Sequence, residues 1–151
     1  MHNAPSGERH IADVKTPEGT VIEFQHSHID ERERRAREQF YEQMIWVVDG
    51  TRLKRDRSTF LTGMNTNRRS TNDANQFVFN GLSRQITRRW MDSQKLVYLD
   101  FGDEDLWCVS PHKVNWQFFA IQVSKSEFAQ AYRAGHVPQA ARHLLMNQTS
   151  T

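Results

Sequence analysis

The short segment at residues 16–20, Thr-Pro-Glu-Gly-Thr, limits the fold of this chain more than any other feature of the sequence. It separates two stretches of strand composition, residues 10–14 and 21–25, which predicts a β-hairpin. Proline and glutamate suit a type I turn, and the glycine suits the left-handed position of a three-residue loop. Such a loop pairs Thr16 with Thr20. Counting back along both strands then places Asp13 directly opposite Glu23.

The opposition of Asp13 and Glu23 has a chemical consequence, because like charges about 5 Å apart on one face of a hairpin repel each other. The repulsion is relieved if a cation lies between the carboxylates or if one of them is protonated. Oxygen ligands at this spacing favour a hard cation such as Mg2+, with Mn2+ as a substitute. Alternation puts Gln25 on the same face as Glu23 and directs Ile22 and Phe24 toward the core. The alternative is an ordinary hairpin with a solvated polar face.

The residues that follow the hairpin predict a helix and a further strand. Asp30 begins a capping-box pattern and apolar residues recur every four positions, which predicts a helix over residues 30–44. The apolar run at residues 45–48 predicts a strand that is buried on both faces. We expect further strands at residues 76–80, 95–101, 106–109 and 117–123, helices at 126–134 and 137–146, and a polar loop at 65–75. The predicted fold class is mixed α/β, with a strand, strand, helix, strand core and a β-rich C-terminal extension.

Length and composition limit the possible domain organisation and cellular location of the protein. A chain of 151 residues has the length of one domain. We expect a flexible start at residues 1–8, a core at 9–50, and an extension at 51–151 that completes the same domain. No apolar run approaches the roughly 20 residues that cross a bilayer, and the start lacks the apolar core of a signal peptide. The sequence has a single cysteine, Cys108, and therefore no internal disulfide framework. Together these features predict a cytoplasmic protein with no membrane partner.

Basic residues are concentrated in the middle of the chain. The formal net charge is only +2, yet residues 58–98 carry six basic and two acidic side chains. Arginine dominates the basic residues, and its planar fork suits phosphate. An anionic partner such as DNA is therefore predicted, and an arginine-rich solvated surface is the alternative.

Two groups of side chains are candidates for contact with nucleic acid. Arg37 and Tyr41 are four residues apart and share a helix face, where they could hold a phosphate. In the alternative, Tyr41 packs in the core and Arg37 pairs with Glu33 or Glu38. The second group is Arg84, Arg88 and Arg89, which lie near Trp90 and could contact the backbone of an unpaired strand or form a solvated helix face.

His26 and His28 sit one residue apart after the second strand. They could bind a transition metal, and His26 could act as a general base. The alternative is that both are polar residues that close the strand, because the sequence shows no third soft ligand beside them.

Several runs of the sequence resemble the competence protein CoiA-like nuclease family of the restriction-endonuclease-like PD-(D/E)XK superfamily. The runs are residues 10–17 (HIADVKTP), 21–27 (VIEFQHS), 37–41 (REQFY) and 44–47 (MIWV). The resemblance implies that Asp13 is the metal-binding aspartate, that Glu23 is the second acid, and that Gln25 stands where most members carry lysine. These three would be the catalytic residues. The backbone carbonyl of Phe24 would be the remaining metal ligand.

The resemblance implies a restriction-endonuclease-like core and a Mg2+-dependent DNA endonuclease that hydrolyses phosphodiesters in DNA uptake, recombination or repair. Family members generally carry a helix and an acidic residue before the first aspartate, often after a zinc ribbon, and the residues before Asp13 show no such pattern. The alternative function is therefore a catalytically impaired nucleic-acid-binding or protein-interaction module. We expect the later strands, a second copy of the chain or an upstream partner segment to cover that edge of the sheet.

Overall fold

The computed structural model has a mixed α/β fold and describes residues 2–3, 9–10, 13–67, 69–70, 76–80, 85–90, 92–109 and 117–146. The strands are β1 (His2–Asn3), β2 (Arg9–His10), β3 (Val14–Lys15), β4 (Val21–Gln25), β5 (Met44–Asp49), β6 (Arg69–Ser70), β7 (Gln76–Asn80), β8 (Leu96–Asp100), β9 (Asp105–Val109) and β10 (Gln117–Ser124). The helices are α1 (Glu31–Phe40), α2 (Asp56–Asn67), α3 (Gln85–Arg89), α4 (Lys125–Arg133) and α5 (Gln139–Met146).

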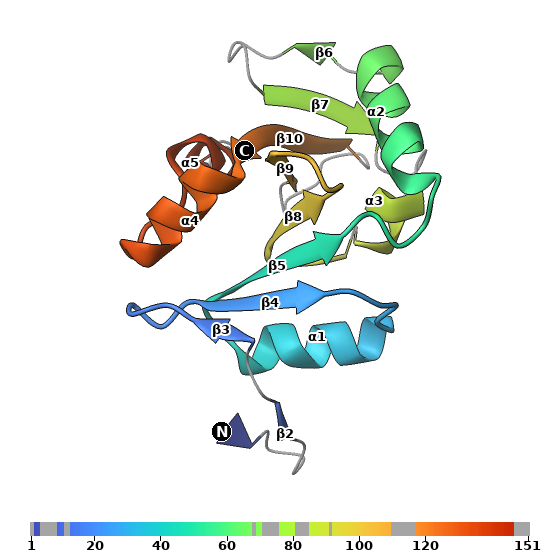
Figure 1. Ribbon diagram of the computed structural model, residues 1–151. Helices are drawn as coiled ribbons and strands as arrows, with labels where there is room; N and C mark the ends of the chain where they lie inside the picture. Colours follow the sequence, from blue (N-terminus) through green and yellow to red (C-terminus); the bar gives the residue numbers. More distant parts are fainter. Residues whose placement is uncertain are drawn as a thin grey trace.

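One mixed sheet contains all of these strands except β1 and β2, which pair with each other (Figure 1). Its order is β3-β4-β5-β8-β9-β10-β7-β6. The strands β4, β5 and β8 run parallel, and the remaining neighbours are antiparallel. The later strands thus extend the sheet beyond β5 and, within the described residues, leave β3 at the opposite edge. A second copy or a partner segment covering that edge stays a prediction.

Helix α1 is the crossover between the parallel strands β4 and β5, as a parallel pair requires. Asp30 caps its start, because its carboxylate accepts a hydrogen bond of 2.8 Å from the Glu33 backbone N–H. The helix ends earlier than predicted, since Tyr41 already has extended backbone angles and Met44 begins β5. The chain needs these residues to turn into the sheet, where the carbonyl of Gln43 accepts from the Val21 N–H at 2.9 Å.

Two apolar clusters fill the two faces of the sheet. Trp46 and Val48 of β5 face a cluster that includes residues of α1, α2 and α3, whereas Ile45 and Val47 face a cluster that includes residues of α4 and α5. Strand β5 is therefore buried on both faces, as the sequence predicts. Figure 1 shows α4 and α5 together on one side of the sheet. Within the described residues, no helix has the length and apolar character needed to cross a membrane.

The structure confirms most predicted elements and, besides the earlier end of α1, corrects four further expectations. Strands β7 to β10 and helices α4 and α5 lie within a few residues of their predicted positions. The predicted strand at residues 10–14 is divided, because residue 10 belongs to β2 and β3 begins at residue 14; residues 11 and 12 lie outside the described part. The prediction of a loop over residues 65–75 is wrong for residues 65–67, which belong to α2, and for residues 69–70, which form β6. Helix α2 itself was not predicted, since its sequence has no apolar period and Phe60 is its one fully buried side chain among those described.

The fourth correction concerns Phe24, which was expected in the core and is 38% exposed. Ile22 lies on the same face of β4 and belongs to the cluster covered by α4 and α5, but that cluster does not extend to Phe24. Alternation therefore predicts the face on which a side chain lies, and the covering helices decide whether it is buried.

Candidate functional site

The turn of the β3–β4 hairpin has the geometry that the sequence predicts. The Thr16 N–H donates to the carbonyl of Thr20 at 2.8 Å, and the Gly19 N–H donates to the carbonyl of Thr16 at 2.9 Å. Gly19 has a φ of 92°, a left-handed conformation that glycine adopts without strain. Thr16 and Thr20 therefore form the pair that sets the register of both strands.

The register of β3 and β4 matches the prediction from this turn. The paired residues are Val14 with Ile22 and Lys15 with Val21. Continuing this register by one residue would put Asp13, which precedes β3, opposite Glu23. The structure thus confirms the hairpin register on which the acidic pair was predicted.

Asp13 lies just beyond the last paired residue of β3, and its side chain continues the hydrogen bonding of the strand. Its Oδ2 accepts from the backbone N–H of Phe24 at 2.8 Å. The N–H and C=O of one strand residue point to the same side, so the carbonyl of Phe24 also faces the side of β4 on which Asp13 lies. The Asp13 carboxylate and the Phe24 carbonyl are therefore oxygen donors at one edge of β4.

Glu23 is almost fully buried, with 1% of its surface exposed. Its Oε2 accepts from Arg37 Nη1 at 3.3 Å, whereas its Oε1 is buried with no hydrogen-bond partner among the described residues. Burial is the main cause that raises the pKa of Glu23; the positive charge of Arg37 opposes the rise, and the negative charge of Asp13 adds to it. Glu23 is thus a buried carboxylate with one oxygen that lacks a hydrogen-bond partner among the described residues.

Arg37 provides the cation that the acidic pair needs. It reaches Glu23 from α1 with Nη1 and also donates from Nη2 to Glu33 Oε1 at 2.6 Å. The alternative pairing with Glu33 is therefore confirmed, and the contact with Glu23 was not foreseen. Glu38, the other suggested partner, pairs with Arg34 instead.

Tyr41 is the C-cap residue of α1 and is 7% exposed, so the alternative that it packs in the core is confirmed. Burial raises the pKa of Tyr41, and the charge of Glu23 raises it further. The charges of Arg37 and Asp13 also act on this hydroxyl. Asp13, Glu23, Arg37 and Tyr41 therefore form one electrostatic cluster, which we call the carboxylate site.

A buried polar network holds α1 against the sheet. Arg34 and Glu38 pair at 3.2 Å, with side chains that are 3% and 5% exposed. Glu38 Oε1 also accepts from the Trp46 indole N–H at 2.9 Å and from the Ser93 hydroxyl at 2.5 Å. Removing one partner of such a buried ion pair strongly destabilises a protein. The network therefore fixes the position of α1, the helix that carries Arg37.

Gln25 follows Glu23 on the same face of β4, two residues further along. Its amide Nε2 donates to the carbonyl of Ser27 at 2.8 Å. It lines a small cavity of about 30 Å³ to which Arg89 of α3 also contributes. Arg89 is paired with the buried Asp56 at 2.7 Å. In the arginine group predicted to contact nucleic acid, Arg88 is exposed on α3 and Arg84 lies outside the described residues.

The two histidines are exposed after the end of β4. His26 Nδ1 lies 3.7 Å from Asp49 Oδ2, and His28 lines the same small cavity as Gln25. The pKa of Asp49 is lowered, chiefly by the hydrogen bond from the Thr51 hydroxyl. No group of three His, Cys, Asp or Glu side chains within the described ranges is placed to hold a metal ion.

The donor set of the carboxylate site fits a hard divalent cation. Mg2+ is typically held by one or two carboxylates, with water and substrate phosphates as the other ligands. Asp13, Glu23 and the Phe24 carbonyl supply oxygen donors only, and the unpartnered Glu23 Oε1 is an acceptor that lacks a partner among the described residues. The site therefore needs no third acidic side chain to satisfy the ligand preferences of Mg2+.

Three residues beside this site were missed by the sequence analysis. Lys15, Phe40 and Gln43 line a cavity of about 440 Å³ to which Tyr41 also contributes. A signal for Lys15 was present, because alternation in β3 puts Lys15 on the same face as Asp13. Phe40 is the last residue of α1, and Gln43 lies in the connection from α1 to β5, whose course depends on packing.

A comparison with protein-family models matches residues 11–125 to the family described as competence protein CoiA, nuclease-like domain. The matched range contains the hairpin, α1, β5 and the strands through β10. Comparison with curated proteins and with solved structures found no match. The family match covers well over half of the chain, including every residue of the carboxylate site. The chain therefore belongs to the family of CoiA nuclease-like domains.

Proposed function

We propose that this protein is a Mg2+-dependent endonuclease that hydrolyses phosphodiester bonds in DNA at the carboxylate site. The observation that carries the proposal is the buried Glu23, whose Oε1 lacks a hydrogen-bond partner among the described residues. The second acid, Asp13, directly precedes β3, the strand that pairs with β4. Burying a carboxylate oxygen without a partner costs stability, which is typical of a site kept for a ligand. The nuclease-like family of the chain supports the same reaction class.

Each residue of the site has a role in this proposal. Asp13, Glu23 and the Phe24 carbonyl would hold the ion, which supplies charge neutralisation and an activated water when bound. Arg37, which pairs with Glu23 and Glu33, would stabilise negative charge on the phosphate. The raised pKa of Tyr41 keeps its hydroxyl protonated and able to donate a hydrogen bond.

Gln25 would position the attacking water, as the residue in the place of the usual lysine. Its amide can donate and accept hydrogen bonds but carries no charge. The positive charge nearest to Glu23 is instead that of Arg37 on α1. The amide of Gln25 must leave the carbonyl of Ser27 to reach a ligand at Glu23, because it donates to that carbonyl here.

The order of elements around the site supports a restriction-endonuclease-like core. An antiparallel hairpin, β3 and β4, is followed by the crossover helix α1 and the parallel strand β5. Both carboxylates and the arginine lie on the hairpin and helix of this unit. Within the cytoplasm, such a hydrolase would act on DNA during uptake, recombination or repair.

A second candidate function is a nucleic-acid-binding module that has lost catalysis. It is favoured by the ion pair itself, because Arg37 already neutralises part of the charge on Glu23 without any metal ion. In that case the carboxylate site would be a structural ion pair, and DNA would bind without being cut.

Incubation of the protein with plasmid and with single-stranded DNA tests the two functions. We expect cleavage with Mg2+ or Mn2+, none with EDTA, and none in Asp13→Ala. Asp103→Ala is the matched control, since Asp103 is an exposed aspartate paired with Arg57. Cleavage that persists with EDTA or in Asp13→Ala contradicts the proposed site. DNA binding without cleavage supports the module, and activity restored by Zn2+ but not by Mg2+ would point to the histidines.

A further inference from the structure

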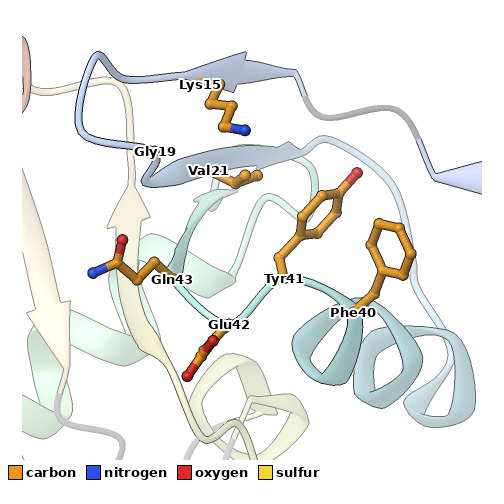
Figure 2. A pocket seen from close by; sticks show the side chains of 7 residues that line it. All are labelled: Lys15, Gly19, Val21, Phe40, Tyr41, Glu42 and Gln43. Atoms are coloured by element: carbon orange, nitrogen blue, oxygen red, sulfur yellow. The ribbon is translucent and has the colours of Figure 1, made fainter. Parts of the chain in front are cut away.

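A cavity of about 440 Å³ opens beside the carboxylate site, between β3, the start of β4 and the end of α1. Its lining residues are Lys15, Gly19, Val21, Phe40, Tyr41, Glu42 and Gln43 (Figure 2). Its volume falls within the range of roughly 300 to 1,000 Å³ that is typical of small-molecule sites. It combines two aromatic rings with the cation Lys15, the amide of Gln43 and the carboxylate of Glu42, which Figure 2 shows on the side away from Lys15.

The position of the cavity relative to the carboxylate site follows from the hairpin register. Lys15 is opposite Val21, and both lie two residues along their strands from the positions of Asp13 and Glu23. Two residues of a strand span about 7 Å, so the cavity begins about 7 Å along the hairpin from the acidic pair. Tyr41 lines the cavity and also interacts electrostatically with Glu23. The two places are therefore neighbours that share one side chain.

The walls of the cavity are held in place. The rings of Phe40 and Tyr41 pack edge to face with centroids 4.9 Å apart. The Glu42 carbonyl accepts from Lys95 Nζ at 2.7 Å, and the Gln43 carbonyl accepts from the Val21 N–H. Figure 2 shows the exposed Lys15 side chain projecting from β3 toward Tyr41. The cavity is thus built on strand pairs and a helix end.

We propose that this cavity binds a single unstacked nucleotide of a DNA strand, the one adjoining the phosphodiester at the carboxylate site. This inference rests on the proposed function and adds the form of the substrate. The base stacks on the half-buried Phe40 ring, as bases stack on aromatic side chains in single-strand binding proteins. The ammonium of Lys15 binds the phosphate of that nucleotide.

A base inside a duplex is stacked on its neighbours and paired with the opposite strand. It enters a side cavity only if the strand is single or if the base leaves the stack at a cost in free energy. The enzyme therefore prefers single-stranded or frayed DNA over an intact duplex.

Binding measurements in EDTA test this inference separately from catalysis. The probes are a fluorescein-labelled single-stranded oligonucleotide, an abasic strand of equal length and charge, and the corresponding duplex, all followed by fluorescence anisotropy. We expect the wild-type protein to bind the base-bearing strand about tenfold more tightly than the abasic strand, as the stacking of one base allows. The duplex should bind less tightly than the base-bearing single strand.

Two variants assign the base and the phosphate to their partners. Phe40→Leu should bind the abasic strand as the wild type does and lose the preference for bases. Lys15→Ala should weaken binding to both strands by the same factor, whereas Lys54→Ala, an exposed lysine outside the cavity, should not. Unchanged binding of the abasic strand also shows that Phe40→Leu is folded.

Equal affinity of the wild type for base-bearing and abasic strands overturns the inference, as does a preference for duplex. So does a Phe40→Leu variant that retains the preference for bases. None of these results depends on cleavage. If the protein instead shows the base preference but never cleaves DNA with Mg2+, the cavity assignment stands and the proposed catalysis fails.

Discussion

Arg37 Nη1 lies 3.3 Å from Glu23 Oε2, which places a helix guanidinium against the buried carboxylate of β4. Two facing carboxylates on a hairpin need a nearby positive charge, and this contact provides one without a bound ion. The contact uses only one oxygen of Glu23, and the other is buried without a hydrogen-bond partner among the described residues. Under the proposed function, a metal ion and Arg37 would share this carboxylate.

Divalent metal should stabilise the folded protein. A ligand that binds only the folded state raises the free energy of unfolding, by about 2.7 kcal/mol at one hundred times its dissociation constant. We expect a higher Tm with millimolar Mg2+ or Mn2+ in thermal unfolding followed by circular dichroism. Asp13→Asn should abolish this rise. A full metal shift in Asp13→Asn, with Asp103→Asn as the control, would show that Asp13 is not a ligand.

Removal of the Arg37 guanidinium should destabilise the protein at neutral pH. Arg37→Met leaves Glu23 buried without its ion pair, and we expect a loss of about 1 to 3 kcal/mol, less than for a fully buried pair because Arg37 is partly exposed. Arg35→Met is the matched control on the same helix, since Arg35 makes exposed ion pairs worth about 0.5 kcal/mol or less. Urea unfolding at pH 7 measures both.

The double variant Arg37→Met, Glu23→Gln then decides the cause of that loss. Replacing the carboxylate removes the unpaired charge, so the double variant should recover part of the stability lost by Arg37→Met alone. If it is less stable than Arg37→Met, the loss arises from packing of the arginine stem and not from its charge.

The raised pKa of Glu23 predicts how stability depends on pH. Between the unfolded value of 4.5 and the higher folded value, the folded carboxyl keeps a proton that the unfolded one releases. This contribution is complete below pH 4.5 and is lost as the pH rises through the folded pKa. The stability of Glu23→Gln relative to the wild type should therefore increase with pH across this window, measured by urea unfolding at a series of pH values.

Metal binding should show the opposite dependence on pH, because the ion binds the ionised carboxylates. We expect the Tm increase caused by Mg2+ to be larger at pH 8 than at pH 5. Equal shifts at both values would contradict Glu23 as a ligand.

Gly135 should be required for the left-handed turn that follows α4. It has a φ of 80°, and a β-carbon at this residue would overlap the carboxyl group of Glu18 in the hairpin turn. We expect Gly135→Ala to lower stability by about 1 kcal/mol or more, chiefly through backbone strain, because the exposed Glu18 side chain can rotate away from the new methyl group. Glu18→Ala added to Gly135→Ala should therefore recover little of the lost stability. A Gly135→Ala variant with unchanged Tm would show that this turn does not require the left-handed conformation.

The sequence predicted the hairpin register because the turn at Thr16 to Thr20 is local chemistry, set by proline and glycine within five residues. It did not predict the pairing of Arg37 with Glu23, because that contact depends on how α1 packs across β4. The same reason explains Phe24, whose exposure is decided by helices much later in the chain. Helix α2 escaped prediction because its sequence lacks an apolar period.

All four members of the carboxylate site come from one continuous stretch between Asp13 and Tyr41, and the strands of the far half of the sheet add none. The site thus depends on short-range connections, which close early in folding and with little loss of chain entropy. Residues in the far half of the sheet should vary with less effect on the acidic pair, apart from Ser93 before β8, whose hydroxyl donates to Glu38 of α1. We therefore expect the sequences of relatives to differ most in that half of the sheet. The β3–β4 hairpin and α1 should vary least if the carboxylate site is functional.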